Sequence, residues 1–253
     1  MTETSTAVAV RPRDVILAAT ERYSDQLAAL APKGTNAAHY VAELRLYLAQ
    51  NEKLLECTPA SVAVGMLRVA QTGLSLGVSC DLLPFGRACQ FSPRYNGIIE
   101  LALSSGVRAV NADVVRVGDF FEWQKGTEFY LRHRRTSIKG AAITHAYAIA
   151  EIKSASFVFE VLSREEIDEL RVKFSKSWKT GALEQIPWYA KKTAVRRLSP
   201  YLPKNARFAA ALMWADQADE VQDGEPMSVD TQTGEILDDG AAEGAAMHAV
   251  IEL

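Results

Sequence analysis

One basic segment, PWYAKKTAVRRLSPYLP at Pro187–Pro203, combines cations with aromatic side chains at helical spacing. A proline is tolerated in the first turn of a helix, and two further prolines end the pattern. Two neighbouring stripes of such a helix hold Trp188, Lys192 and Arg196, and Tyr189, Thr193 and Arg197. Lys191 lies beside both. The segment is either a solvated basic helix whose aromatic residues belong to the core, or a helix that contacts phosphate groups.

The distribution of charge favours the second interpretation. The net charge is −3, but ten acids and no Lys or Arg lie between Asp219 and the C-terminal residue. Residues 1–218 therefore carry 28 bases against 21 acids, and residues 171–207 carry ten bases against the single acid Glu184. A basic body with an acidic tail is typical of proteins that bind polyanions.

Composition argues against secretion and membrane insertion. Three cysteines without a CxxC pair, Cys57, Cys80 and Cys89, indicate buried thiols in a reducing compartment. Apolar runs stay well short of the ~18 residues that a membrane span needs. The charged run from Arg11 to Asp14 stands where a signal peptide would be apolar, so we expect a cytoplasmic protein.

The motifs of common active sites are not found. The glycines near Gly73 lack the phosphate-loop pattern, and the four histidines are scattered without zinc-ligand spacing, so we expect no metal and no cofactor. We expect His133 to belong to a basic rim and His145 to be a structural residue of a strand. Strand acids remain as an alternative, because two-metal nucleases use such carboxylates. Asp113, Asp119, Glu122 and Glu151 alternate with apolar residues, which favours the solvent face of a sheet.

Periodicity and turn residues predict an α+β fold, with a central antiparallel sheet of about four or five strands flanked by helices. Helices are expected over Asp14–Leu30, His39–Asn51 after an Asn36 cap, Thr58–Gly73, Asn96–Ser104, from the Ser163–Glu166 capping box to Val172, and Arg207–Gln217. Strands are expected over 88–92, 107–117, 120–124 paired with 128–132, and 143–152 paired with 156–162.

Four segments are expected along the chain. Residues 1–35 form an N-terminal arm and helix, 36–203 a single core domain, 204–218 a short helix, and 219–253 a flexible acidic tail.

Cations and aromatic residues also alternate outside the Pro187 segment. They do so at Phe85–Arg87, at Phe91–Tyr95, and around Arg132–Arg135. Proteins that bind single-stranded nucleic acid need this mixture, because cations neutralise the backbone and flat side chains stack on bases.

Several of these blocks resemble the RecT family of phage and prophage single-strand annealing proteins. The stretch LLPFGRACQFSPRYNGIIELALSSG is similar to the family's core motif, and FEVLSREEI at Phe159–Ile167 to its strand and helix cap. The Pro187 segment is similar to the family's PW and KTxxRRL signature. The resemblance runs from about Ala49 to Pro203. The sequence departs from the family at Asn96, where Lys is usual, and at Ser92–Arg94, which replaces a more strand-like run.

The resemblance implies a protein that binds single-stranded DNA in a basic groove, assembles into rings or helical filaments and anneals complementary strands without ATP. It implies no covalent chemistry, so the protein would not be an enzyme. Its partners would be single-stranded DNA, the annealed duplex and further copies of the chain, with a host single-strand-binding protein and a companion exonuclease as possible additions. The alternatives are a metal-dependent nuclease and a phage structural or adaptor protein.

We expect DNA contacts from the cations and aromatic residues of these blocks. The candidate residues are Arg87, Phe91, Arg94, Tyr95, Arg132, Arg134, Arg135, Lys153, Trp188, Lys191, Lys192, Arg196 and Arg197. Phe91, Tyr95 and Trp188 are candidates for base stacking, with a place in the core as the alternative for each.

Overall fold

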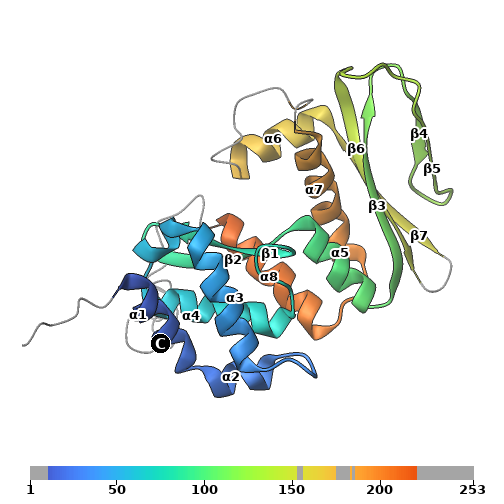
Figure 1. Cartoon of the computed structure of the whole chain (residues 1–253). Helices are drawn as coiled ribbons and strands as arrows, with labels where there is room; N and C mark the ends of the chain where they lie inside the picture. Colours follow the sequence, from blue (N-terminus) through green and yellow to red (C-terminus); the bar gives the residue numbers. More distant parts are fainter. Residues whose placement is uncertain (1–10, 153–155, 175–182, 184–185, 221–253) are drawn as a thin grey trace, which may run out of the picture. The chain divides into compact units, whose positions relative to one another are not determined.

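The computed structural model describes residues 11–152, 156–174, 183 and 186–220 (Figure 1). These residues form two compact units, residues 11–92 and residues 93–220. The boundary falls within the segment 36–203 that the sequence predicts as one core domain. No helix in these described ranges is long and apolar enough to cross a bilayer.

The first unit consists of helices followed by one β-hairpin. Its elements are α1 (Pro12–Glu21), α2 (Ser24–Leu30), α3 (Ala37–Gln50), the short helix η1 (Glu52–Glu56), α4 (Pro59–Thr72), β1 (Cys80–Phe85) and β2 (Ala88–Pro93). The predicted helix over Asp14–Leu30 is in fact two helices. The break has a local cause, because the Ser24 hydroxyl donates to the Glu21 carbonyl and competes with the helical hydrogen bonds there.

Predicted caps position the helices of this unit. The Asn36 side chain accepts a hydrogen bond of 2.9 Å from the His39 amide and begins α3. Thr58 caps α4 through the Ser61 amide at 3.4 Å, and Gly73 ends that helix with φ of 69°. These ends could be predicted because each depends on a few neighbouring residues.

The second unit contains most of the β structure. Its elements are α5 (Tyr95–Ser104), β3 (Val107–Arg116), β4 (Phe120–Gln124), β5 (Tyr130–Arg134), β6 (Ile143–Ile152), β7 (Phe157–Ser163), α6 (Arg164–Phe174), α7 (Pro187–Leu198), η3 (Ser199–Tyr201) and α8 (Ala206–Glu220). The predicted α+β class with antiparallel pairing is confirmed. The described strands form three sheets, β3-β6-β7, β4-β5 and β1-β2, where the sequence predicts one sheet of four or five strands.

Helix α7 and the β4–β5 hairpin lie on opposite sides of the β3-β6-β7 sheet (Figure 1). Helix α7 packs against all three strands. Three alanines of β6, at positions 146, 148 and 150, alternate on one face and are buried, which allows a helix to approach closely. On the other face, the Phe121 ring of the hairpin stacks on Tyr147 of β6, with ring centroids 5.9 Å apart. The sheet therefore has a helical side and a hairpin side.

The register of the hairpin differs from the prediction by two residues. Phe120 pairs with Arg134 and Gln124 with Tyr130, so the connection spans residues 125–129 rather than 125–127.

The predicted capping box of α6 is confirmed. The Ser163 amide donates to the Glu166 carboxylate at 2.9 Å, and the Glu166 amide donates to the Ser163 hydroxyl at 3.3 Å.

Candidate nucleic-acid interface

Helix α7 separates its apolar residues from its cations. Ala190, Ala194 and Leu198 are buried, whereas Lys192 and Arg196 are half-buried on the other side of the helix. This is the segregation that the spacing of the sequence predicts. Arg197 and Trp188 are exposed, and Trp188 retains 41% of its surface; Tyr189, in the second predicted stripe, is buried instead.

Lys191 reaches from α7 to a carboxylate of the sheet. Its Nζ lies 3.0 Å from Oδ1 of Asp113 on β3, and the guanidinium of Arg135 binds the same carboxylate. Burial alone would raise the pKa of Asp113, but hydrogen bonds from Arg135 and Lys191 outweigh that effect and lower it. Lys191 and Arg135, two predicted phosphate contacts from distant parts of the sequence, thus lie beside one carboxylate. Its single negative charge neutralises only one of the two positive charges.

Arg196 also has a carboxylate partner. Its Nη2 lies 3.2 Å from Oδ1 of Asp216 on α8, and the Asp216 side chain is largely exposed. The Arg196 side chain is 22% exposed and that of Asp216 is 72% exposed, so the carboxylate can turn into solvent when a phosphate group binds the arginine. Lys192 and Arg196 remain the central cations of this face.

The hairpin carries its arginines differently. The guanidinium of Arg132 lies over the Tyr130 ring at 5.2 Å from its centroid, and that of Arg134 lies over Phe120 at 5.4 Å. Arg132 also lies 3.6 Å from the Glu122 carboxylate, a long and exposed ion pair. Both predicted contacts are therefore on the surface, each supported by an aromatic ring.

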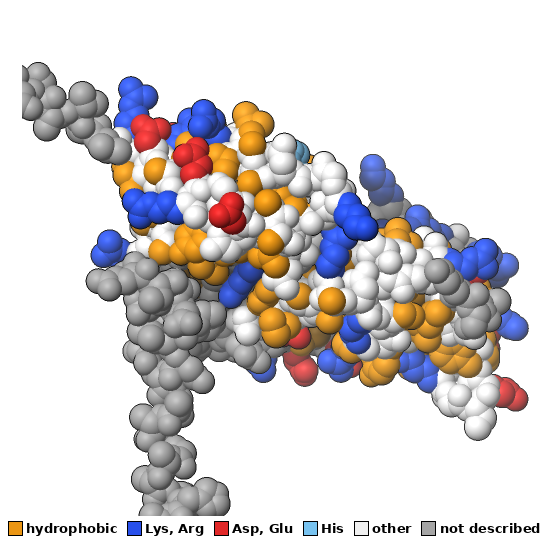
Figure 2. All heavy atoms as spheres, turned by 90° about the horizontal axis from the view of Figure 1, so that it is seen from below, with side chains coloured by type: hydrophobic (Ala, Val, Ile, Leu, Met, Phe, Trp, Pro, Cys, Tyr) orange, Lys and Arg blue, Asp and Glu red, His pale blue; other side chains and the backbone are white. Residues whose placement is uncertain are grey.

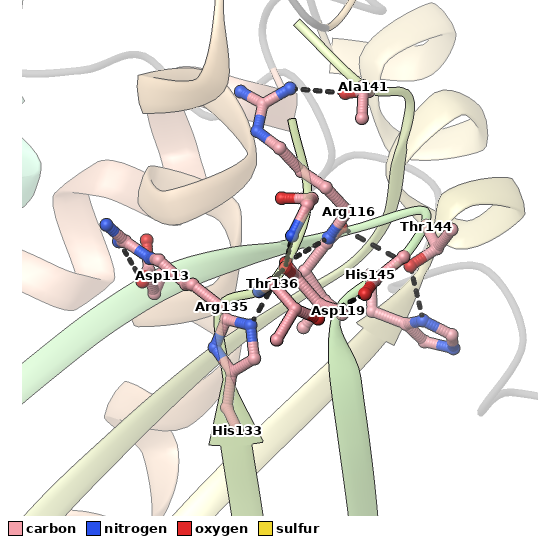
Figure 3. A network of polar contacts seen from close by, with 12 residues as sticks. Asp113, Arg116, Asp119, His133, Arg135, Thr136, Ala141, Thr144 and His145 are labelled. Atoms are coloured by element: carbon pink, nitrogen blue, oxygen red, sulfur yellow. Dashed lines mark hydrogen bonds and ion pairs between the residues drawn. The ribbon is translucent and has the colours of Figure 1, made fainter. Parts of the chain in front are cut away.

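A polar network holds the base of the hairpin (Figure 3). The Asp119 carboxylate accepts hydrogen bonds of 2.9, 2.8 and 2.8 Å from the backbone amides of Arg116, Thr136 and Ser137. His133 Nε2 lies 3.2 Å from the same carboxylate, and its Nδ1 lies 3.2 Å from the Tyr147 hydroxyl. Burial would raise the pKa of Asp119, but the three amides outweigh it and lower the pKa far below its usual range.

Two predictions for this region are wrong. The side chain of Asp119 is only 1% exposed and that of His133 only 5%, so neither belongs to a solvent face or a basic rim. Both are interior groups that fix the hairpin. A short polar residue after Val117-Gly118 is typical of a turn, and this was the signal available in the sequence. The structural role predicted for His145 agrees with its contacts to Thr144 and the Phe121 ring.

The remaining strand acids also have specific partners. Glu151 pairs with Arg108 at 2.7 Å, and Glu122 with Arg132. Across the described parts of the chain, no three His, Cys, Asp or Glu side chains are grouped as metal ligands would be. The strand acids thus serve as ion-pair and hydrogen-bond partners, and nothing in their arrangement favours the nuclease alternative.

Phe91 requires a correction. Its side chain is 0% exposed, so it belongs to the core of the first unit and cannot stack on a base. In the same unit, Arg87 is exposed at the turn between β1 and β2, next to Gly86 with φ of 55°. Lys153, another predicted contact, lies outside the described residues.

Arg94 and Tyr95 begin the second unit. Arg94 is the residue before α5, and both side chains are exposed.

On the face drawn in Figure 2, Lys and Arg side chains are spread among hydrophobic ones rather than gathered in one patch. The cations of the second unit thus form local groups on α7, around Asp113 and on the hairpin.

Two comparisons with known proteins indicate the same family. The sequence model of the RecT family matches residues 41–230 of the chain. The chain is also similar to Protein RecT of Escherichia coli (strain K12), with 32% identity over 236 residues, which covers 84% of this chain and 81% of the relative.

Proposed function

The chain belongs to the RecT family, which supports a role in DNA recombination by single-strand annealing, and from this premise we propose a mechanism. The protein binds single-stranded DNA mainly through phosphate contacts from α7 and its neighbours. It assembles on the strand as a ring or helical filament and promotes pairing with a complementary strand. No nucleotide cofactor and no covalent step are involved.

Pairing of complementary strands is limited by a kinetic barrier and not by an unfavourable free energy. Pairing of complementary strands is downhill, so ATP is not needed. Repulsion between phosphates and self-structure within each strand slow the reaction. Lys and Arg side chains reduce the repulsion, and an extended bound strand keeps its bases available for pairing. Contacts to backbone rather than base edges imply little sequence preference.

The arrangement of α7 is the observation that carries the proposal. The helix is fixed on the sheet by buried residues and carries Lys192 and Arg196 on its other side, with Arg197 exposed at the edge of the buried face. Beside it, Lys191 and Arg135 share one carboxylate, which leaves that cluster with a net positive charge. A positioned group of cations loses less conformational freedom on binding than mobile side chains would.

The proposed contact set keeps the residues that the sequence predicts, except Phe91, which is buried. Phosphate contacts are Arg87, Arg94, Arg132, Arg134, Arg135, Lys153, Lys191, Lys192, Arg196 and Arg197, and the stacking residues are Tyr95 and Trp188.

The decisive experiment mixes two complementary dye-labelled oligonucleotides and follows their pairing by energy transfer. We expect faster pairing with protein than without, at equal rates with and without ATP. A variant carrying Arg22→Ala and Lys33→Ala serves as the control, because both cations are exposed and lie outside the proposed contact set. No acceleration by the correctly folded protein would refute the proposal.

The same reaction with Mg²⁺ tests the nuclease alternative. We expect labelled single-stranded DNA to keep its full length after incubation with the protein. Shortened products that disappear in an Asp113→Asn or Glu151→Gln variant would favour the strand acids as catalytic groups instead.

A further inference from the structure

The outward face of the β4–β5 hairpin has a composition of its own. Side chains of directly paired residues lie on the same face of a hairpin, and successive residues alternate between faces. The pairing of Phe120 with Arg134, Glu122 with Arg132 and Gln124 with Tyr130 therefore places all six side chains on one face. We call this set the aromatic–arginine face.

This face is accessible among the described residues. Phe120 is 46% exposed, Arg134 is exposed, the Arg132 side chain is 69% exposed, and Tyr130 is half-buried. Each guanidinium covers one ring, Arg134 over Phe120 and Arg132 over Tyr130. With Glu122 as its one acid, the face carries two positive charges against one negative charge.

The opposite face of the hairpin packs against the sheet at several positions, although Trp123 on that face is 42% exposed. Phe121 and His133 contact Tyr147 of β6, with centroids 5.9 and 5.5 Å apart. Farther along, Phe129 packs on Phe159 of β7 at 4.5 Å. The hairpin is therefore held against the sheet through one face, which leaves the aromatic–arginine face as its outward surface.

Both ends of the hairpin are also tied down. The Asp119 network fixes the base, where three backbone amides bind one carboxylate. At the far end, Lys125 Nζ lies 2.6 Å from Glu160 Oε1 and 5.6 Å from the centroid of the Phe159 ring. A binding surface with such supports is pre-organised, because little freedom is lost when a ligand binds.

We propose that the aromatic–arginine face binds bases of a single-stranded polynucleotide by stacking, with the arginines contacting adjacent phosphates. This inference rests on the proposed function and assigns to it a second, base-contacting surface on the hairpin side of the sheet. Phe120 and Tyr130 are the stacking residues. Neither residue was singled out for DNA contact by the sequence patterns.

Charge and chemistry favour a polynucleotide over a protein partner. The face is positive overall, and planar guanidinium groups over aromatic rings form flat surfaces that suit bases of any sequence. Same-face residues along a strand recur about every 6.6–6.8 Å. Successive nucleotides of an extended strand can therefore meet successive side chains, whereas an acidic peptide would not require the rings.

The test compares a normal oligonucleotide with an abasic one of equal length and charge. Wild-type protein is expected to bind the normal strand more tightly than the abasic one. In the double variant Phe120→Leu with Tyr130→Leu, the ratio of the two affinities should fall roughly tenfold. The abasic strand should bind wild type and variant alike. Phe120→Trp with Tyr130→Trp should keep the preference, which shows that flat rings rather than these residues as such are required.

A matched control removes two other exposed aromatic residues. Phe157→Leu with Tyr201→Leu, at 51% and 65% exposure, should leave the preference unchanged. If the Phe120 and Tyr130 variant folds and binds both strands as wild type does, the inference is wrong while the proposed function stands. It is likewise wrong if that variant changes only self-association. If wild type binds neither strand, the proposed function fails as well.

Discussion

Helix α7 and the β4–β5 hairpin both display arginines, but they hold them with different partners. On α7 and beside it, Lys191 and Arg196 are paired with the carboxylates of Asp113 and Asp216. On the hairpin, Arg132 and Arg134 lie over aromatic rings, and the Glu122 carboxylate is a more distant partner of Arg132 at 3.6 Å. A carboxylate competes with a phosphate for its cation, whereas a ring leaves the edge of the guanidinium available.

The difference predicts two kinds of DNA contact. Binding through α7 should depend strongly on salt, because each phosphate contact releases counterions. Binding through the hairpin should depend more on the bases, because stacking has no such charge term. One protein would then hold the backbone with a helix and the bases with a hairpin, and variants of each should be separable.

The largest effect is expected from the base of the hairpin. Asp119→Ala leaves three backbone amides, two of them part-buried, and the buried His133 side chain without their shared acceptor, which should cost roughly 1–3 kcal/mol of local stability. Hydrogen exchange of the amides of Arg116, Thr136 and Ser137 should become faster. Glu122→Ala on the same strand, at an exposed position, should change stability by no more than about 0.5 kcal/mol. Unchanged exchange in the Asp119 variant would show that the network does not hold the hairpin.

The same carboxylate makes the hairpin sensitive to acid. Its pKa is lowered in the folded protein, so its contribution to stability is present above the unfolded value of about 3.9. That contribution is lost as the pH falls below this value toward the folded pKa. We therefore expect the exchange rates of wild type and Asp119→Asn to converge in acid. Parallel profiles down to the lowest pH would contradict this.

Next in size is the effect of removing the outward cations of α7. Lys192→Ala with Arg196→Ala should weaken binding to all single-stranded sequences alike and reduce the slope of log K against log salt by about one to two. The preference for a normal over an abasic strand should stay, since these two cations contact the backbone and not the bases. The Arg22 and Lys33 variant is the control. An unchanged slope in the folded variant would remove α7 from the DNA site.

The sequence predicts the arrangement of α7 better than it predicts the arrangement of the hairpin. The α7 face follows from spacing within one helix, and the helix caps at Asn36, Thr58 and Ser163 depend on neighbouring residues, so local patterns suffice. The hairpin was predicted as a pair of strands, but its register was not, because alternation alone does not fix which residues are opposite.

Burial was harder to predict than secondary structure. The flanking cations predict a DNA contact for Phe91 and a place in a basic rim for His133, yet both side chains are interior. Alternation assigns a residue to one of two faces but does not say which face another element covers. Contacts such as Lys191 and Arg135 at Asp113 join distant segments, so their presence depends on the tertiary fold.

A smaller effect is expected where the two regions meet. Asp113→Asn removes the negative charge shared by Lys191 and Arg135, so both cations become available to phosphate. Affinity for single-stranded DNA at low salt should rise several-fold, with a salt slope steeper by up to about 0.7. Asp216→Asn, which releases only Arg196, is the matched comparison. Weaker binding in the Asp113 variant would mean that the carboxylate positions the two cations rather than competing for them.

The smallest effect is expected from the acidic tail. Its ten acids lie among residues 219–253, and we propose that they recruit a partner such as a single-strand-binding protein or an exonuclease. A tail with that role does not contact the cations of α7, so deleting it should not change DNA affinity at low salt. If the tail instead occupies those cations, deletion tightens binding, and the gain should disappear in the Lys192 and Arg196 variant. Because the hairpin arginines are supported by rings, a competing tail would affect phosphate binding on α7 more than base stacking on the hairpin.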